Sequence, residues 1–79
     1  MVAQDLEAEL QAIIQETIQH AGLVAGDLPI TEIPGWGSLN HVRVMIAIEK
    51  KFGLRFAGRE VASVRTFNDL VRLVERKTA

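Results

Sequence analysis

The stretch that decides the fold is residues 36–53, WGSLNHVRVMIAIEKKFG. From Ser38 to Phe52 the apolar residues recur at the spacing of an amphipathic helix, and Gly53 is the residue type that most often ends a helix in the left-handed conformation. Ser38 is able to cap the first backbone amides. Apolar side chains cover a very wide arc, so we expect the helix to be largely buried; they are Leu39, Val42, Val44, Met45, Ile46, Ile48 and Phe52.

The polar side of the same helix is narrow and basic. Two further polar residues, His41 and Glu49, fall inside the apolar arc, and we expect each of them at its rim or paired with a partner. Because this exposed side is basic, we expect it to bind partners that have acidic surface patches. This basic strip consists of Arg43, Lys50 and Lys51 and lies next to Asn40.

Amphipathic helices are predicted on both sides of this stretch. Residues 4–21 carry a single helical stripe, and Gly22 supplies a stop. Thr66 followed by Asp69 is a variant of the capping box, which predicts the start of a last helix. The stripe of the first helix is Leu6, Leu10, Ile13, Ile14 and Ile18, and that of the last is Phe67, Leu70, Val71 and Val74.

The remaining segments are short or irregular. Glycine and proline keep residues 22–36 without regular structure, and a loop of this length is usually functional or packed by its own side chains. One or two helical turns are expected around residues 59–63, with Val61 and Val64 packed inward. No strand pattern or repeat is present, so the expected fold is all-α: a small four-helix bundle, three main helices plus one short helix, in one domain over residues 1–79. The side chains expected to fasten the loop are Leu23, Leu28, Ile30 and Ile33.

Length and composition exclude several classes of protein. A chain of 79 residues with 48% hydrophobic and 24% charged residues is an ordinary small globular domain. The absence of cysteine excludes disulfides and thiolate metal sites. No apolar run approaches the roughly 18 residues that cross a bilayer, and the first ten residues are acidic where a secretory signal would be basic. We therefore expect a cytoplasmic monomer that does not insert into membranes.

The net charge of −1 conceals an asymmetry along the chain. Residues 1–42 contain six acids and no Lys or Arg, whereas residues 43–79 contain nine bases and four acids, so the two parts carry −6 and +5. Such a separation suggests an oriented interaction surface. A nucleic-acid surface is disfavoured, because acids lie near about half of the bases and the isoelectric point is about 6.1.

Enzymatic motifs are missing from the sequence. There is no glycine-rich phosphate loop and no HExxH, and the two histidines, His20 and His41, are too few for a metal centre of the His/Cys type. Ser38 and His41 lie three residues apart, but a serine nucleophile also needs a group that orients its base and an oxyanion hole, and neither is visible. We expect no catalytic residues and no metal site.

Two segments together carry a resemblance to a known family. GWGSLNHVRVMIAIEKKFGL, residues 35–54, followed by VRTFNDLVRLVERK, residues 64–77, resembles the acyl carrier and peptidyl carrier proteins. The resemblance runs from about Leu6 to Lys77. It depends on a Ser-Leu pair that opens a helix, the helix end AIEKKFGL, the short element EVAS and the capped last helix at the expected spacings.

The resemblance implies a function. In this family a phosphopantetheinyl transferase attaches 4′-phosphopantetheine to the serine at the start of the second helix, and the thiol of that group carries acyl groups as thioesters. Ser38 would be the attachment site, with Gly37 and Leu39 beside it and Trp36 just upstream. Val42 would lie next to the arm and, with the basic strip, would contact acyl-transferring or acyl-activating enzymes.

Two departures from the family pattern shape this expectation. The family usually has an aspartate immediately before the serine, where this chain has Gly37, and it usually presents an acidic second helix, where this chain has the basic strip. A specialised carrier whose own enzymes have acidic docking patches accounts for the second departure. The alternative function is a degenerate, carrier-like helical interaction module without a prosthetic group.

Overall fold

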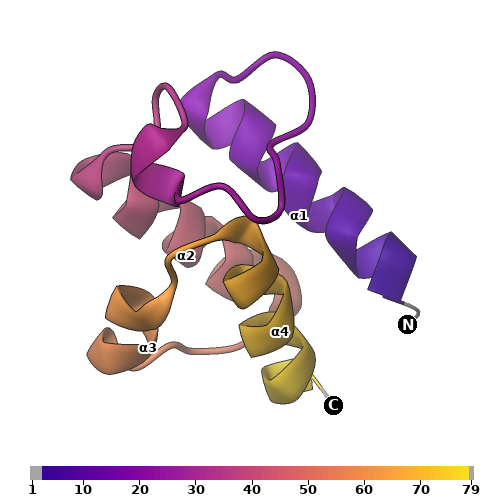
Figure 1. Ribbon diagram of the computed structural model, residues 1–79. Helices are drawn as coiled ribbons and strands as arrows, with labels where there is room; N and C mark the ends of the chain where they lie inside the picture. Colours follow the sequence, from indigo (N-terminus) through magenta and orange to yellow (C-terminus); the bar gives the residue numbers. More distant parts are fainter. Residues whose placement is uncertain (1–2, 79) are drawn as a thin grey trace.

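The computed structural model describes residues 3–78, and their side chains from Asp5 onward. In order along the chain it contains α1 (Ala3–Ile18), the 3-10 turn η1 (Ile30–Glu32), α2 (Ser38–Phe52), α3 (Gly58–Ser63) and α4 (Phe67–Thr78) (Figure 1). Residues 3–78 contain no strand, only an isolated bridge between Pro29 and Thr66. The prediction of an all-α bundle with three main helices and one short helix is confirmed.

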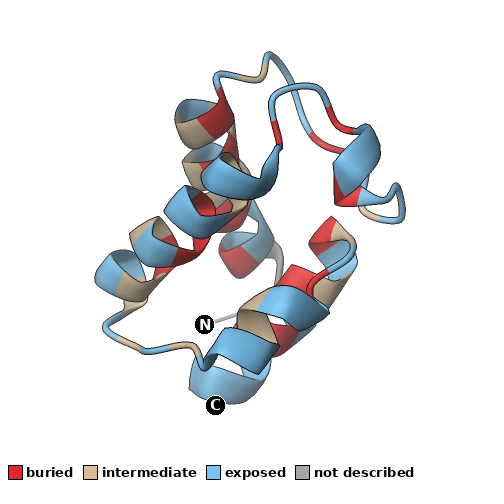
Figure 2. Cartoon of the chain, turned by 90° about the vertical axis from the view of Figure 1, so that its left-hand side faces the viewer, coloured by how far each residue is buried: buried red, intermediate tan, exposed pale blue. Residues whose placement is uncertain are grey.

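The helices enclose one hydrophobic core, to which each of the three long helices contributes a stripe. α1 packs against both α2 and α4. In Figures 1 and 2 the start of α1 and the end of α4 lie on the side opposite the long loop, and η1 lies near the start of α2. Six large side chains exclude solvent almost completely, so the core is small but well packed. They are Leu10, Ile14, Val44, Ile48, Leu70 and Val74.

The first helix is shorter at its end than the sequence predicts. It stops at Ile18, three residues before position 21, because Gln19 already takes the left-handed conformation with φ of 55°. The amide of His20 then donates to the carbonyl of Gln15 at 3.0 Å, which closes the last turn. Gly22 (φ 81°) lies beyond the end and is not the stop.

The loop between α1 and α2 is fastened by a different set of side chains from the one predicted. Ile30 and Ile33 are buried as expected, but Leu28 is exposed and Leu23 is 76% exposed. Val24 and Trp36 take their places in the core. An apolar side chain in an irregular loop can point toward the core or toward solvent. Composition alone therefore did not predict which of these loop residues are buried.

Polar contacts explain why Val24 points inward. The Gln11 side chain makes two hydrogen bonds to the backbone of Val24, accepting from its amide and donating to its carbonyl, both at 3.0 Å. At the other end of the loop the amide of Ile30 donates to the Arg65 carbonyl at 2.8 Å, and the amide of Asn68 donates to the Gly26 carbonyl at 3.0 Å. The loop is therefore held against both α1 and the entry to α4.

Helix α2 has the predicted bounds, but the prediction that it is largely buried is wrong. It runs from Ser38 to Phe52 and ends at Gly53 in the left-handed conformation. Its buried residues are Val44, Met45 and Ile48. On the other side of the helix, three apolar side chains of the predicted buried arc are exposed to solvent: Leu39 at 65%, Val42 at 47% and Ile46 at 43% exposure.

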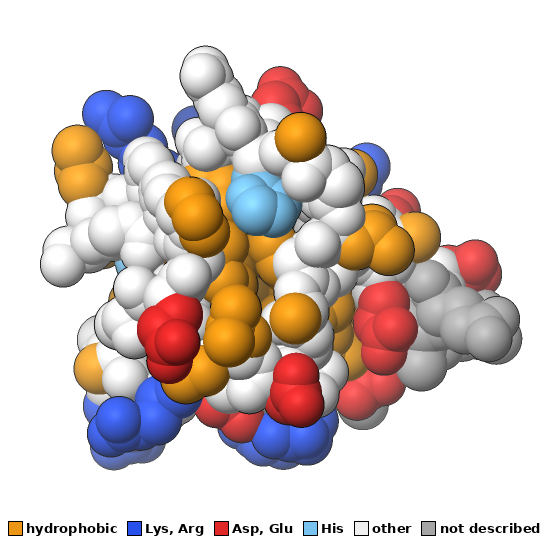
Figure 3. Space-filling view, turned by 45° about the horizontal axis from the view of Figure 1, so that its top comes forward, with side chains coloured by type: hydrophobic (Ala, Val, Ile, Leu, Met, Phe, Trp, Pro, Cys, Tyr) orange, Lys and Arg blue, Asp and Glu red, His pale blue; other side chains and the backbone are white. Residues whose placement is uncertain are grey.

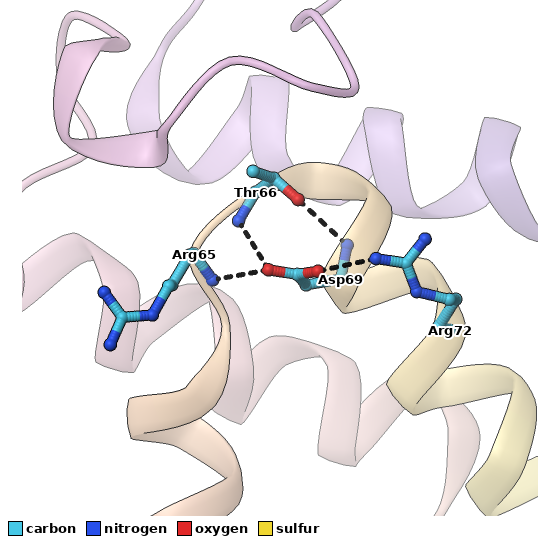
Figure 4. A network of polar contacts seen from close by, with 4 residues as sticks. All are labelled: Arg65, Thr66, Asp69 and Arg72. Atoms are coloured by element: carbon cyan, nitrogen blue, oxygen red, sulfur yellow. Dashed lines mark hydrogen bonds and ion pairs between the residues drawn. The ribbon is translucent and has the colours of Figure 1, made fainter.

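The last two helices match their predictions. Val64, directly after α3, is buried and Val61 is half-buried, and the whole predicted stripe of α4 lies in the core. At the start of α4 the Thr66 hydroxyl accepts from the Asp69 amide at 3.1 Å, and the Asp69 carboxylate accepts from the Thr66 amide at 3.2 Å (Figure 4). The capping box is thereby confirmed. None of the described helices is long and apolar enough to span a membrane.

Candidate functional site

Ser38 is the first residue inside α2, and its side chain does not cap the helix. The N-cap position belongs to Gly37, whose backbone is extended (φ −91°, ψ −176°) and whose carbonyl accepts from the amide of His41 at 2.8 Å. A glycine has no side chain with which to cap, and no side-chain cap bond is present. The predicted capping role of Ser38 is therefore wrong. Its exposed hydroxyl is instead left free at the positive end of a 15-residue helix.

The backbone that leads into Ser38 is fixed by close contacts. Gly35 has φ of 88°, and a Cβ placed on it would lie 2.9 Å from the carbonyl oxygen of Ile18. The Asn40 side chain donates to the Gly35 carbonyl at 2.7 Å, and the amide of Trp36 donates to the Ile33 carbonyl at 3.1 Å. Since Trp36 is only 4% exposed, the turn before Ser38 is anchored in the core.

Gly37 is a glycine of a different kind. Its φ is negative, its surface is exposed, and a Cβ built on it would have no neighbour within 4 Å. Space and backbone geometry would therefore accept a larger residue at this position, including the aspartate that is usual in the carrier family. The structure therefore requires glycine at position 35, whereas position 37 would accept other residue types.

His41 uses both ring nitrogens for contacts within the domain. The indole nitrogen of Trp36 donates to Nδ1 at 3.1 Å, and Nε2 lies 2.8 Å from the carbonyl oxygen of Val61. A carbonyl can only accept, so the proton of the neutral ring is on Nε2 and Nδ1 is the acceptor. His41 is paired at the rim of the apolar arc, as predicted, and is not held as a base for Ser38. Glu49 is paired as well, since it accepts from the amide of Phe56 at 2.8 Å.

A hollow of about 200 Å³ lies directly beside Ser38. The entry to α2 forms one of its walls, with Trp36, Ser38 and His41, and the α3 side forms another, with Val61 and Val64. The lining is mostly apolar. Apolar side chains are also exposed elsewhere on the surface: Figure 3 shows one face of the molecule on which hydrophobic side chains gather near the middle, while acidic and basic side chains lie toward the edges.

The outward side of α2 combines apolar and basic residues. Leu39, Val42 and Ile46 follow one another at steps of three and four and form an exposed apolar stripe. Helical periodicity places Arg43 and Lys50 along its border, whereas Lys51 lies farther around the helix. Leu39 and Ile46 were not recognised as surface residues from the sequence. The available signal was an apolar arc wider than one helix of so small a domain can bury.

The basic strip makes no ion pair within the described chain. The two ion pairs found among residues 3–78 join Arg72 to Asp69 at 2.6 Å and Lys77 to Glu60 at 3.0 Å. All three cations of the strip are exposed. The described residues likewise contain no group of three or more His, Asp or Glu that could hold a metal ion.

The arrangement of the helices matches that of a known structure. A solved structure described as "a putative acyl carrier protein(Rv0033) from Mycobacterium tuberculosis" superimposes on the chain with a TM-score of 0.84, covering 90% of this chain and 96% of that one at 18% sequence identity. No sequence profile of a known family and no curated protein sequence matches the chain. The fold of this protein is therefore that of an acyl carrier protein.

Proposed function

We propose that the protein is a specialised acyl carrier protein, not itself an enzyme, that carries acyl groups on 4′-phosphopantetheine attached to the hydroxyl of Ser38. The observation that carries the proposal is this exposed hydroxyl, left without a capping role at the start of α2 on an acyl-carrier fold. When attached, the group supplies a terminal thiol that holds acyl groups as thioesters. The residues around Ser38 position the group.

The start of α2 suits a phosphodiester on Ser38. The first backbone amides of a helix attract negative charge, and here no side chain caps them. Gly37 and Leu39 flank the attachment point, and the missing Cβ of Gly37 leaves space on one side. The apolar hollow between Trp36 and Val61 offers a place for the part of the arm nearest the protein.

The outward side of α2 is the proposed docking surface for partner enzymes. An exposed apolar stripe rimmed by charge is the usual composition of such a surface. Val42 lies in the exposed apolar stripe, and Arg43 and Lys50 of the basic strip supply its charged border. An enzyme that reaches Ser38 has to approach this side, so we expect acidic residues on its docking patch. A phosphopantetheinyl transferase is the first such partner.

A second candidate function is an interaction module without a prosthetic group. One specific observation favours it: Gly37 occupies the position of the usual aspartate although the space would accept an aspartate. In this case the exposed stripe and the basic strip would bind a partner directly, and Ser38 would remain unmodified.

The experiment that separates the two functions is the intact mass of the protein after incubation with coenzyme A and a broad-specificity phosphopantetheinyl transferase. We expect one phosphopantetheinyl group on the wild type and none on Ser38→Ala. Ser63→Ala is the matched control, because the Ser63 hydroxyl already donates to the Glu60 carbonyl at 2.8 Å, and it should be labelled like the wild type. Wild-type protein that is never labelled would instead support the interaction module.

A further inference from the structure

The outward side of α2 exposes the apolar stripe of Leu39, Val42 and Ile46 to solvent. Arg43 and Lys50 run along one border of the stripe, and neither forms an ion pair within the described residues. A symmetric contact between the stripes of two copies would bring the cations of both copies together, and like charges repel. An occupant of this surface should therefore carry negative charge.

Helix α1 of the same chain carries negative charge along one line. At about 100° per residue, Asp5, Glu9 and Glu16 fall within an arc of about 40° on this helix, and we call them the acidic line. None of them forms an ion pair within the described residues, and no Lys or Arg precedes Arg43 in the sequence. The Oε2 atom of Glu9 is buried and has no hydrogen-bond partner there. The domain itself therefore leaves the charge of the acidic line unbalanced.

The acidic line and the basic border of the stripe have the same spacing. Seven residues separate Glu9 from Glu16, which is about 10.5 Å along the axis of α1. The same number separates Arg43 from Lys50 on α2. Between the two acids, Ala12 is exposed and offers a small apolar surface to the stripe. Two such helices laid side by side can pair both charges at once.

We propose that the outward side of α2 binds α1 of a second copy of this chain, with the acidic line of one copy against Arg43 and Lys50 of the other. Such a contact joins two different surfaces, so each copy still has its other surface free to bind a further copy. One helix against one helix buries much less than the about 1,600 Å² of a standard interface, so the association is weak and depends on concentration. Dilute protein is then the monomer that the sequence predicts.

The contact would also regulate access to the candidate site. Leu39 directly follows Ser38, so a second copy that covers the stripe blocks the side from which an enzyme reaches the serine. This consequence rests on the proposed carrier function, whereas the contact itself does not. An enzyme with an acidic docking patch would compete with α1 of the neighbouring copy for the same surface, and concentrated protein would therefore bind it less well.

The association can be measured on the unmodified protein by sedimentation equilibrium and by amide NMR at increasing protein concentration. At about 0.01 M salt, where the Debye length is about 30 Å, we expect the average mass to rise above the 8.7 kDa of the monomer. At about 1 M salt, where the Debye length is about 3 Å, the mass should return to that of the monomer. The amide signals that shift should belong to α1 and to the outward side of α2. A mass that stays at the monomer value in millimolar protein, or shifts confined to α2, would overturn the proposal.

Charge reversal identifies the two surfaces. Arg43→Glu with Lys50→Glu should abolish the rise in mass, and so should Glu9→Lys with Glu16→Lys, because both surfaces then carry the same sign. All four substitutions in one chain keep the net charge of the wild type and should restore the association. If this variant stays monomeric, the proposal is wrong. Should Glu9→Lys prevent folding, Asp5→Lys with Glu16→Lys reverses two exposed positions of the acidic line and must give the same results.

A control for net charge uses bases outside both surfaces. Arg59→Glu combined with Arg76→Glu changes the net charge as much as reversal of the border does, and both side chains are exposed. This variant should still associate at low salt. A loss of association equal to that of Arg43→Glu with Lys50→Glu would mean that overall charge decides the behaviour, and it would overturn the proposal.

Competition tests the consequence for the candidate site. Ser38→Ala with Arg43→Glu and Lys50→Glu keeps the acidic line but cannot be labelled, and an excess of it should slow the labelling of wild-type protein by a transferase. The same competitor with Glu9→Lys and Glu16→Lys added should not, and equal effects of the two would rule out this regulation. Wild type that is never labelled would count against the carrier function and leave the association results standing. Labelled protein that stays monomeric would overturn the association alone.

Discussion

The starts of α2 and α4 use polar side chains in opposite ways. At α4 the Asp69 carboxylate accepts from the amides of Arg65 and Thr66 at 3.1 and 3.2 Å and lies 2.6 Å from Arg72, while the Thr66 hydroxyl caps in return (Figure 4). At α2 the N-cap is a glycine, and the Ser38 hydroxyl stays exposed. We call the start of α4 the closed start, because its polar side chains are engaged in capping. We call the start of α2 the open start, because the Ser38 hydroxyl is not.

The difference teaches how to separate structural from functional polar residues. A hydroxyl that caps a helix is occupied, and modifying it would cost the cap. The chain forms a full capping box at α4 and forms none at α2, although both starts have a hydroxyl residue nearby. The proposed attachment of a group to Ser38 requires such an open start.

The largest predicted effect is a difference in the free energy of unfolding between variants of the two glycines that precede Ser38, Gly35 and Gly37. Gly35→Ala should lower the free energy of unfolding by roughly 1–3 kcal/mol, because φ of 88° is unfavourable for a side chain and the new Cβ would press against the Ile18 carbonyl. Gly37→Ala, with open space and negative φ, should lose less, because it gives up only the preference for glycine over alanine at an N-cap. Urea denaturation of both variants tests this contrast, and equal losses would mean that the turn before Ser38 is not fixed as described.

The next effect concerns the charge next to the open start. Arg43→Glu combined with Lys50→Glu should slow acylation by the cognate enzyme about tenfold or more at low salt, with the difference shrinking as salt screens the attraction. Stability should change little, because both side chains are exposed. Arg59→Glu combined with Arg76→Glu makes the same change in net charge away from α2. If the two double variants change the salt dependence of kcat/KM equally, the basic strip has no part in partner choice.

The closed start predicts a pH-dependent contribution to stability. The hydrogen bond from the Arg65 amide, assisted by Arg72, holds the pKa of Asp69 below its ordinary value of 3.8. The folded state therefore favours the carboxylate, which stabilises the fold above about pH 4 and ceases to do so as the pH falls through the lowered pKa. Asp69→Asn should cost about 1 kcal/mol at pH 7. The gap to wild type should narrow in denaturation curves taken below pH 4, and a pH-independent gap would contradict this account.

The smallest predicted effect comes from Gly37→Asp, which gives the start of α2 a carboxylate, as Asp69 does at the start of α4. Gly37→Asp should raise stability by roughly 0.3–1 kcal/mol, because a carboxylate next to the first turn interacts favourably with the helix dipole. It should also speed labelling by a generic transferase, since an acid at this position is usual in the carrier family. Thermal melts and a labelling time course measure both, with Gly37→Asn as the uncharged control. A slower time course for the aspartate variant would mark glycine as an adaptation to a dedicated transferase.

Much of the fold was predictable because helical periodicity and caps are local signals. The bounds of α2, the Thr66 and Asp69 box and the buried stripe of α4 depend on residues within a few positions of one another. Contacts between distant segments left no such signal. Gln11 fastens Val24 from thirteen residues away, and the bond from His41 to the Val61 carbonyl spans twenty residues.

For the candidate site, the sequence predicted that Ser38 lies at a helix start, and the structure agrees. The sequence could not show that Gly37 takes the N-cap position and leaves the Ser38 hydroxyl free, because that depends on backbone angles. Leu39 and Ile46 of the exposed stripe on α2 were placed in the buried arc, whereas Val42 was also predicted to contact partners. An apolar residue carries no mark of which side of a helix has a neighbour, and only packing of α1 against α2 decides it.

The most direct test of the central claim measures both labelling and stability in two variants. Ser38→Ala and Thr66→Ala are each labelled with coenzyme A and transferase, weighed as intact proteins, and unfolded in urea. We predict that Ser38→Ala loses all labelling with less than about 0.5 kcal/mol of stability, as expected for a surface position without a cap bond. Thr66→Ala should keep full labelling and lose about 1 kcal/mol. Labelling that persists in Ser38→Ala, or a loss of stability there equal to that of Thr66→Ala, would contradict the account.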